Sequence, residues 1–351
     1  MDELDRQLLN RIQASVPFAA RPFAQLADEL GCDESAVIQR ISALRQAGII
    51  REISAIFDAV ALGYRQALVA MTVPLEKLDQ AGRIAAEHPG VSHCYGRAGE
   101  VNLWLTLAIS PQSSLGLETS AGLLARLTGA TAHMVLPTIR RYKLQVRFDM
   151  EPEKPMPAPA PVTPDAPGAS TPAVANTTAP ELTETQRRAI RALQIDLPAE
   201  PEPFARLAAA EDLDVETLLA CGRDFLDAGQ MRRYSAVLHH RAAGGKANVL
   251  VAWIADDAQA DLDGPLAARV AGISHCYLRP TGHNWPYNIY TMIHGRSEAD
   301  CRKTIETVLA TTSLIEYREL WTTAEYKKRR VPLFASQEAD WESRNAGNAT
   351  K

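Results

Sequence analysis

The sequence has few cysteines and no excess of positive charge. Its 351 residues include five cysteines, an odd number without a CxxC pair, so we expect neither a disulfide framework nor a structural zinc site. The formal net charge is −5, with 15 Lys and Arg against 15 Asp and Glu in residues 1–150 and 21 against 24 in residues 181–351. Because neither half is basic, neutralising the phosphates of a nucleic acid is not expected to be the main task of the chain.

Long hydrophobic runs are absent as well. No apolar stretch approaches the roughly 20 residues that a membrane-spanning helix needs, and the sequence does not begin with a basic segment followed by an apolar run. We therefore expect a cytoplasmic protein without a membrane partner. Hydrophobic residues make up 46% and charged residues 23% of the chain, as in soluble globular proteins, and the length is enough for about two domains.

A proline-rich segment divides the chain into two similar halves. Residues 151–180 hold 9 of the 22 prolines, among Ala, Ser and Thr, which predicts an extended, solvated linker. On either side of it, PFAQLADELGCDESAV at 22–37 is repeated as PFARLAAAEDLDVETL at 203–218, and VSHCY at 91–95 is repeated as ISHCY at 273–277. The chain is therefore predicted to be a tandem fusion of two diverged copies.

Each copy has the pattern of an α+β protein with two domains. Apolar residues at helical spacing predict helices at 3–14, at 23–30 and after Asp33, and IIREISAIFD then predicts two short β segments, so this part forms a winged helix-turn-helix. A strand, helix, strand, strand, helix, strand order follows and ends in one strand at 131–146, which is typical of a ferredoxin-like (βαββαβ) domain. We expect the two sheets to pack together as a pseudo-symmetric pair within one chain.

The predicted domain boundaries follow from these patterns. They are a winged helix-turn-helix at 1–60, a ferredoxin-like domain at 61–150, the linker at 151–180, a second winged helix-turn-helix at 181–241, a second ferredoxin-like domain at 242–335 and a C-terminal tail at 336–351.

A polar motif occurs at the same place in both copies. SHCYGR at 92–97 and SHCYLR at 274–279 lie on predicted strands, where alternate side chains share a face. One face then holds His93, Tyr95 and Arg97 in the first copy, and His275, Tyr277 and Arg279 in the second. The intervening Cys94 and Cys276 face the other way and are expected to be small core residues. A histidine at a strand end is more often structural than catalytic, but repetition in register with tyrosine and arginine favours a functional site.

The winged-helix segments resemble a family of transcription factors. DRQLLNRIQ at 5–13, LADELGCDESAVIQRISALRQAGII at 26–50 and LGY at 62–64 resemble the leucine-responsive regulator/AsnC family, and the resemblance covers each half almost from end to end. It implies DNA binding and a small-molecule pocket between paired sheets.

A narrower resemblance is carried by REISAIFDAVALGY at 51–64, MRRYSAVLHHRAAGGKAN at 231–248, and HCYLRP with WPYNIYTMIHG in the second copy. These segments resemble the siroheme decarboxylases, paired regulator-like subunits of haem d1 biosynthesis and of the alternative haem pathway. The first half is similar to the D-type (or A-type) subunit and the second to the L-type (or B-type) subunit. The resemblance implies the removal of two acetate carboxylates from siroheme, giving 12,18-didecarboxysiroheme.

The chemistry of such a substrate suggests roles for particular residues. Carboxylates on a macrocycle require cations and hydrogen-bond donors around a cleft with apolar walls; arginine binds carboxylates bidentately, and histidine exchanges protons near neutral pH. We predict His93 and His275 as proton donors, with Tyr95 and Tyr277 as secondary donors. The predicted substrate-binding residues are Arg97, Arg279, Arg232, Arg233, His239, His240, Arg241, Arg140, Arg141, Tyr142, Trp285 and Tyr287.

Several of these residues have alternative interpretations. The segment 232–241 could form a solvated wing hairpin, and His239 or His240 could be an axial ligand of the siroheme iron. Residues 140–142 could merely close the edge of a sheet, and the aromatic residues of TGHNWPYN could hold a hairpin together instead of stacking on the macrocycle. KKRR at 327–330 is predicted to be a solvated end. No cofactor is expected, because the metallated macrocycle itself accepts electrons.

Three functions stay open at this point: a fused siroheme decarboxylase, a DNA-binding regulator of the leucine-responsive type, and a tetrapyrrole-binding sensor or carrier without chemistry. The second copy argues against DNA binding, because its third helix has one arginine among four acidic residues in DVETLLACGRDFLDAG, which phosphates would repel. The expected partners are siroheme and its decarboxylated products, and the regulator family implies a homodimer of the fused chain.

Overall fold

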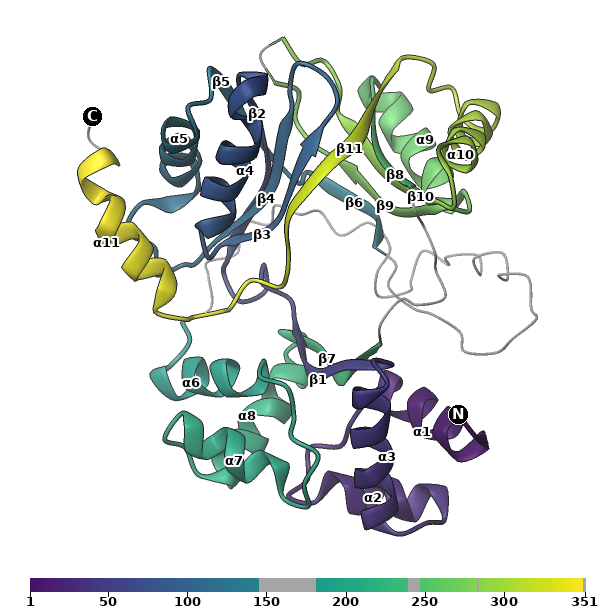
Figure 1. The fold of residues 1–351 in the computed structure, drawn as a ribbon, viewed down its shortest axis with the longest axis vertical. Coiled ribbons are helices and arrows are strands. Elements are labelled where there is room, and N and C mark those ends of the chain that lie inside the picture. Colours follow the sequence, from purple (N-terminus) through teal and green to yellow (C-terminus); the bar gives the residue numbers. More distant parts are fainter. Residues whose placement is uncertain (145–180, 239–246, 283, 350–351) are drawn as a thin grey trace.

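The computed structural model describes residues 1–144, 181–238, 247–282 and 284–349. These residues form two lobes (Figure 1). Three helices from each copy make the lower lobe, and the upper lobe consists of strands with further helices on their outer side. A two-stranded sheet lies between the lobes. The α+β class and the duplicated plan are confirmed.

The lower lobe contains two three-helix units that share one hydrophobic core. The helices are α1 (Glu3–Ala14), α2 (Pro22–Leu30) and α3 (Glu34–Gln46) in the first copy, and α6 (Glu184–Leu193), α7 (Pro203–Ala210) and α8 (Val215–Asp227) in the second. Asp2 and Thr183 begin α1 and α6 with capping boxes, and Gly31 ends α2 with a φ of 65°. The Phe18 ring leaves no room for a Cβ at Gly222 of α8, so the two units pack tightly against each other.

Among the described residues, the expected wing does not form within either copy. IIREISAIFD yields a single strand, β1 (Ile50–Phe57), which pairs with β7 (Met231–Leu238) of the other copy. The register places Ser54 opposite Ser235, its equivalent in the repeat, so a pseudo-two-fold axis passes between these serines. Each copy thus satisfies the exposed strand edge of the other, which the sequence of one copy cannot indicate.

The upper lobe contains a continuous nine-stranded sheet in the order β5-β2-β4-β3-β11-β8-β10-β9-β6. The strands of the first copy are β2 (Arg65–Thr72), β3 (Val91–Arg97), β4 (Leu103–Ile109), β5 (Ala132–Pro137) and β6 (Arg140–Leu144), and those of the second are β8 (Ala247–Trp253), β9 (Ile273–Leu278), β10 (Ile289–Gly295) and β11 (Tyr317–Lys328). Covering helices are α4 (Leu78–Glu87), which follows the short η1 (Leu75–Lys77), α5 (Gly116–Thr128), α9 (Asp257–Arg269) and α10 (Glu298–Thr311).

The last strand of each copy crosses to the other copy. The single strand predicted at 131–146 is interrupted at Thr138 and Ile139, so that β5 pairs with β2 of its own copy and β6 pairs with β9 of the other. β11 makes the same crossing without interruption, from β8 to β3 (Figure 1). Because β5 and β6 end the sheet order but are joined in the chain, the sheet curls into a ring. The expected pairing of the two sheets is confirmed.

Strand alternation gives this ring an outer face and an inner face. The outer face packs on the helices in a separate core for each copy. Apolar side chains of both copies meet on the inner face in one cluster: Ala70, Trp104, Leu136, Leu250, Ala252, Trp285, Tyr290 and Leu320. A site on the inner face therefore receives residues from both copies.

The KKRR segment is solvated at Lys328, Arg329 and Arg330, as its composition predicts, but its first lysine is half-buried. Lys327 Nζ donates hydrogen bonds of 2.8 Å to two carbonyl oxygens at the end of α4, one of them that of His88. Arg330 donates to Ser54 Oγ at 3.0 Å. The expected tail contains α11 (Gln337–Ala349), which lies beside α5 (Figure 1), and its Trp341 packs on His88 with ring centroids 4.2 Å apart. The end of the chain therefore connects the ring to the two-stranded β1–β7 sheet, called the wing sheet below, and to α4 and α5 of the first copy.

Candidate functional site

The two polar motifs lie on the inner face of the ring, as the alternation predicts. Tyr95 is paired in register with Trp104, and Tyr277 with Tyr290, and both partners belong to the inner cluster. The intervening cysteines are fully buried in the outer cores, so their assignment as core residues is confirmed.

Each motif forms a row of side chains along its strand. The imidazole and phenol ring centroids are 6.2 Å apart for His93 and Tyr95, and 6.1 Å apart in the second copy. The guanidinium carbon lies 5.3 Å from the ring centre for Arg97 over Tyr95 and 5.0 Å for Arg279 over Tyr277, within the range of cation–π attraction. The structure therefore brings the histidine, tyrosine and arginine of each motif together.

The motif arginines reach across to strands of the other copy. Arg97 donates to the Leu320 carbonyl oxygen at 2.8 Å, and Arg279 donates to that of Leu136 at 2.6 Å. Their side chains are 4% and 8% exposed, burial lowers the pKa of each guanidinium to about 10, and no described carboxylate is among the groups that act on them. Both Nε atoms lack a hydrogen-bond partner among the residues that the structure describes. A buried cation without a counter-ion is unfavourable, so this pair favours an anionic ligand.

A serine holds each motif histidine through its Nδ1 atom. Ser92 Oγ lies 3.0 Å from His93 Nδ1, and Ser274 Oγ lies 2.7 Å from His275 Nδ1. Ser274 Oγ also donates to the Met292 carbonyl oxygen at 3.2 Å, so it receives the Nδ1 proton of His275. The neutral His275 then presents the lone pair of Nε2, which can accept a proton and later deliver it.

The two motif histidines are electrostatically coupled. Burial, together with the positive charges of His294 and His93, lowers the pKa of His275 to about 4. Burial likewise lowers the pKa of His93, together with Lys328, whereas Glu325 raises it. Because His93 acts on His275, the two copies contribute to one connected polar region.

Strand β6 divides its three predicted residues between the two faces. Arg140 forms a salt bridge with Asp261 of α9, and Tyr142 donates to a carbonyl oxygen of α9 at 2.8 Å and packs on Gly264. Arg141, between them, lies opposite Tyr277 on the inner face. The structure thus places Arg140 and Tyr142 away from the candidate site and keeps Arg141 in it.

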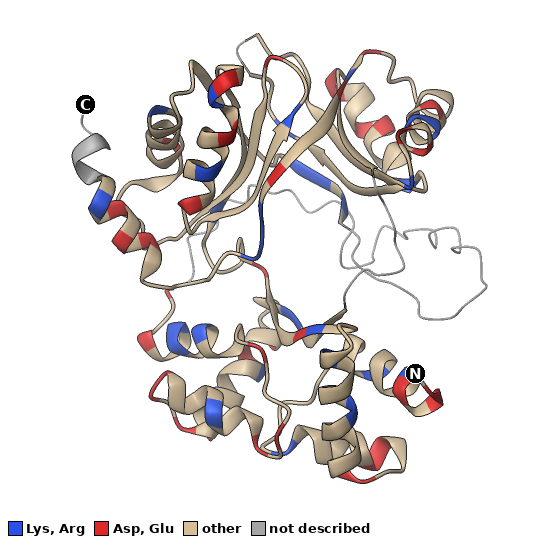
Figure 2. Cartoon of the chain, viewed as in Figure 1, with Lys and Arg blue, Asp and Glu red and all other residues tan. Residues whose placement is uncertain are grey.

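The wing sheet adds further cations. Arg232 of β7 donates to Asp58 Oδ2 at 2.6 Å, and its charge acts on Tyr277. Arg233 acts electrostatically on Arg330, beyond the end of β11. Figure 2 shows basic segments on β6 and after β11 on the side of the upper lobe that faces the wing sheet. The predicted residues His239, His240 and Arg241, and with them the possible iron ligand, lie outside the described residues.

The aromatic residues of the second-copy hairpin have a structural role. Trp285 is 2% exposed, its ring centroid lies 5.5 Å from that of Trp104, and its Nε1 donates to the Tyr290 hydroxyl at 2.8 Å. Tyr287 packs on Trp285 with ring centroids 4.7 Å apart. Trp285 is therefore a core residue that is not available to stack on a macrocycle, and Tyr287 supports it.

Sequence reasoning missed five polar residues on these strands: Ser92, Ser274, His294, Glu325 and Lys328. The serines precede the histidine in both copies, so the repeat itself contains the signal for them. Glu325 lies opposite Tyr95, and Lys328 opposite His93, but nothing in the first copy repeats them. Only the register of β11 brings these two residues to the site.

The helices that would contact DNA are occupied by other parts of the chain. Arg40 of α3 forms salt bridges with Asp2 and Asp5 at 2.8 and 2.7 Å, and Arg45 binds Asp196 of the second copy at 2.6 Å. These arginines therefore hold the lower lobe together, which supports a scaffold role for the winged helices.

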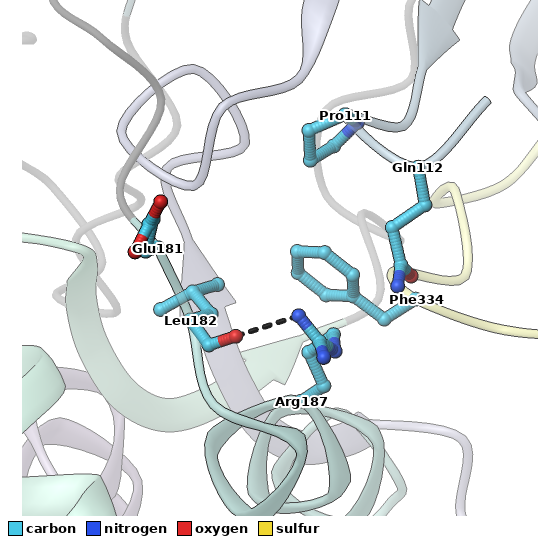
Figure 3. Close-up of a pocket in the computed structure, with 6 residues that line it drawn as sticks. All are labelled: Pro111, Gln112, Glu181, Leu182, Arg187 and Phe334. Carbon is cyan, nitrogen blue, oxygen red and sulfur yellow. Dashed lines mark hydrogen bonds between the residues drawn. The ribbon is translucent and has the colours of Figure 1, made fainter.

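A separate pocket lies between the lobes, and Figure 3 shows its lining. It has a volume of about 360 Å³ and is lined by Pro111, Gln112, Glu181, Leu182, Arg187 and Phe334. Arg187 donates to the Leu182 carbonyl oxygen at 2.6 Å. No motif residue lines this pocket. Within the described part of the chain, no group of three potential ligands is placed to hold a metal ion, and no helix is long and apolar enough to cross a membrane.

Family models match both parts of the repeat. Residues 61–143 and 242–327 match the AsnC-like ligand binding domain, and residues 5–51 match the siroheme decarboxylase NirDL-like HTH domain. The siroheme decarboxylase of Hydrogenobacter thermophilus is 33% identical over 340 residues, which cover 97% of each chain.

Solved structures agree over the same length. A crystal structure of the siroheme decarboxylase NirDL matches with a TM-score of 0.80 and 29% identity over 100% of both chains. Another, of the siroheme decarboxylase NirDL in complex with an iron-uroporphyrin III analogue, matches with a TM-score of 0.79 and 29% identity over 99% of both chains.

Proposed function

The chain belongs to the siroheme decarboxylase family, and from this we infer that it decarboxylates siroheme, a carboxy-lyase reaction. The product is 12,18-didecarboxysiroheme, formed when two acetate side chains become methyl groups. One observation carries the proposal: the buried Arg97 and Arg279 lie over the motif tyrosines, in the same rows as the motif histidines, without any described carboxylate as a partner.

Binding is the first task that these residues perform. Siroheme has carboxylates around its whole rim, and guanidinium groups bind carboxylates bidentately. Arg97, Arg279 and Arg141 provide such groups on the inner face, and Arg232 provides one on the wing sheet. The analogue in the relative's crystal structure is likewise an iron tetrapyrrole, which agrees with a macrocycle site in this fold.

Proton delivery is the second task. The bond between the methylene carbon and the carboxylate breaks, carbon dioxide leaves, and its bonding electrons enter the macrocycle, so no separate electron-accepting cofactor is needed. One proton must then reach each methylene carbon. His93 and His275 are the proposed donors, with Tyr95 and Tyr277 as secondary donors.

The low pKa of His275 fits this role once substrate is bound. At neutral pH the free protein holds His275 uncharged, because burial lowers its pKa to about 4. Carboxylates beside the ring favour the imidazolium form and raise the pKa. When substrate binds, Nε2 of His275 therefore takes up the proton that the reaction consumes.

Anaerobic incubation with siroheme followed by mass spectrometry tests the proposed reaction. Loss of two molecules of carbon dioxide is expected, whereas binding without a change of mass would favour a tetrapyrrole sensor or carrier. A gel shift with promoter DNA tests the regulator alternative, for which no shift is expected. Separate His93→Ala and His275→Ala variants test the donors, and unchanged turnover in both would contradict the assignment.

We also propose that the fused chain forms a homodimer in the cytoplasm, because the resemblance to the regulator family implies a dimer. Size-exclusion chromatography with light scattering measures the molar mass and so tests the oligomeric state. Twice the mass of one chain is expected, and the mass of a single chain would contradict the proposal.

A further inference from the structure

Arg141 and Glu325 occupy equivalent places on the two crossing strands. Arg141 of β6 is the register partner of Tyr277, and Glu325 of β11 is the register partner of Tyr95. The fold is pseudo-symmetric here, but the charge is reversed. The two halves of the inner face therefore differ most where each crossing strand meets its motif tyrosine.

The surroundings of Tyr277 are cationic. Arg279 lies over its ring, with 5.0 Å between the guanidinium carbon and the ring centre. Burial raises the pKa of Tyr277, while the charges of Arg279, Arg141 and Arg232 oppose that rise. Asp58 balances Arg232 through a salt bridge of 2.6 Å. Arg279 is nine-tenths buried, with an unpartnered Nε and no described counter-ion.

The surroundings of Tyr95 include a carboxylate. Burial and the charge of Glu325 raise its pKa to about 12, and Arg97 opposes this rise. Lys328, the register partner of His93, is the other cation of this half. A substrate carboxylate that approaches Tyr95 would therefore meet a negative charge in the place where Arg141 stands in the other half.

A histidine adds to the difference. His294 lies on β10 two residues beyond Met292, which is the register partner of His275, and its charge acts on His275. In the first copy the register of β4 against β3 puts Ala108 at the equivalent place. The half around Tyr277 thus has Arg141 and His294, which can carry positive charge. The equivalent places in the half around Tyr95 hold Glu325 and Ala108.

We propose that the reacting acetate of siroheme binds in the half of the ring around Tyr277, with Arg141 and Arg279 as the anchors of its carboxylate, and that Glu325 keeps it out of the half around Tyr95. This rests on the proposed function, which it deepens by assigning the substrate to one half. The orientation follows directly: each of the two acetates lies near His275 when it reacts.

Charge reversal at the two equivalent positions tests the proposal. Iron-uroporphyrin III and siroheme serve as probes in anaerobic absorbance titrations of the full chain, with Arg141→Glu, Arg141→Gln, Glu325→Arg and the double swap. Arg302→Glu is the matched control, because it makes the same change of charge on α10, on the outer side. Thermal melting of each variant shows that it is folded, and Arg141→Gln keeps the test valid if the charge reversal unfolds the chain.

The expected results differ between the two positions. Arg141→Glu weakens binding by about 100-fold and Arg141→Gln by about 10-fold, as for the loss of a charge-assisted contact, while Glu325→Arg binds at least as tightly as the unmodified chain. The double swap regains at least about tenfold over Arg141→Glu. Unchanged affinity in a folded Arg141→Glu variant, or equal weakening by Glu325→Arg, would overturn the proposal.

The same titrations separate this proposal from the proposed function. If siroheme is decarboxylated but Arg141→Glu has no effect, the assignment to one half fails and the function stands. If iron-uroporphyrin III binds in an Arg141-dependent way but siroheme keeps its mass, the function fails and the assignment stands. If neither probe binds, both fail.

Discussion

The Ser274 hydroxyl oxygen lies 2.7 Å from Nδ1 of His275, and the same hydroxyl is within 3.2 Å of the Met292 carbonyl oxygen. A hydroxyl has one proton to donate, and a carbonyl can only accept. The chain of bonds therefore assigns the Nδ1–H tautomer to neutral His275 and leaves Nε2 as the atom that takes up and releases the catalytic proton.

Loss of this serine should slow the reaction without preventing binding. Ser274→Ala removes one hydrogen bond worth about 1 kcal/mol and frees the ring to adopt the other tautomer, so kcat should fall about fivefold with little change in KM. Ser92→Ala is the matched control, for which a smaller effect is expected because Ser92 orients His93 in the half that Glu325 protects. Steady-state kinetics check this, and an equal or larger loss in Ser92→Ala would contradict the expectation.

Ligand binding should take up protons near neutral pH. The pKa of His275 is about 4 in the free protein, and bound carboxylates raise it, so the complex holds more protons than the free protein at any pH between the two values. Calorimetric titration with iron-uroporphyrin III in buffers of different ionisation enthalpy measures the uptake. His275→Gln should reduce it, and identical uptake in that variant would mean that another group takes the proton.

The motif arginines should matter for binding more than for folding. Arg279→Met replaces a buried, unpaired guanidinium with an apolar side chain of similar length, which costs little stability or even adds some, apart from about 1 kcal/mol for the bond to Leu136. Siroheme affinity should fall at least about tenfold, while the melting temperature stays within a few degrees. A variant that unfolds, or that binds normally, would show that Arg279 is a structural cation.

Acid should lower the free energy of unfolding, because His88 is buried in its neutral form. Burial lowers its pKa to about 3, against an unfolded value near 6.5, so the unfolded state binds a proton first as the pH falls. The stabilisation is complete above about pH 6.5 and is lost between pH 6.5 and 3, by about 5 kcal/mol in all. Urea unfolding of His88→Gln should show a flatter pH profile over this range, with the exposed His133→Gln as control. Parallel profiles for His88→Gln and the unmodified chain would contradict this.

Local patterns were enough to predict the helices and the faces of the motif strands. Alternation along β3 and β9 separates each buried cysteine from its neighbouring histidine and tyrosine, because a buried strand has two distinct sides. Alternation gave a wrong prediction for the last strand of the first copy, which is divided into β5 and β6. Residues 131–146 look like one strand because both halves are apolar or amphipathic, and the crossing at Thr138 depends on the partner strand β9, which belongs to the other copy.

The repeat aligns Arg141 of RRYK with Glu325 of AEYK, so the charge reversal itself is visible in the sequence. That each of them lies opposite a motif tyrosine could not be predicted, because it depends on the register of β11 on β3 and of β6 on β9, which non-local pairing decides. The wings differed from expectation because β1 finds its partner in β7 and not in its own copy. A sequence repeat predicts the fold of each copy. It does not predict how the two copies exchange strands, because that depends on which strand edges each copy leaves unpaired.

The central claim is that a proton held by the protein replaces carbon dioxide at two side chains of siroheme. The most direct measurement is the mass of the product formed anaerobically in deuterated water. Loss of two molecules of carbon dioxide, with one deuterium gained in each new methyl group, is the predicted result. Siroheme recovered with its mass unchanged, at protein concentrations high enough to bind all of it, would contradict the account.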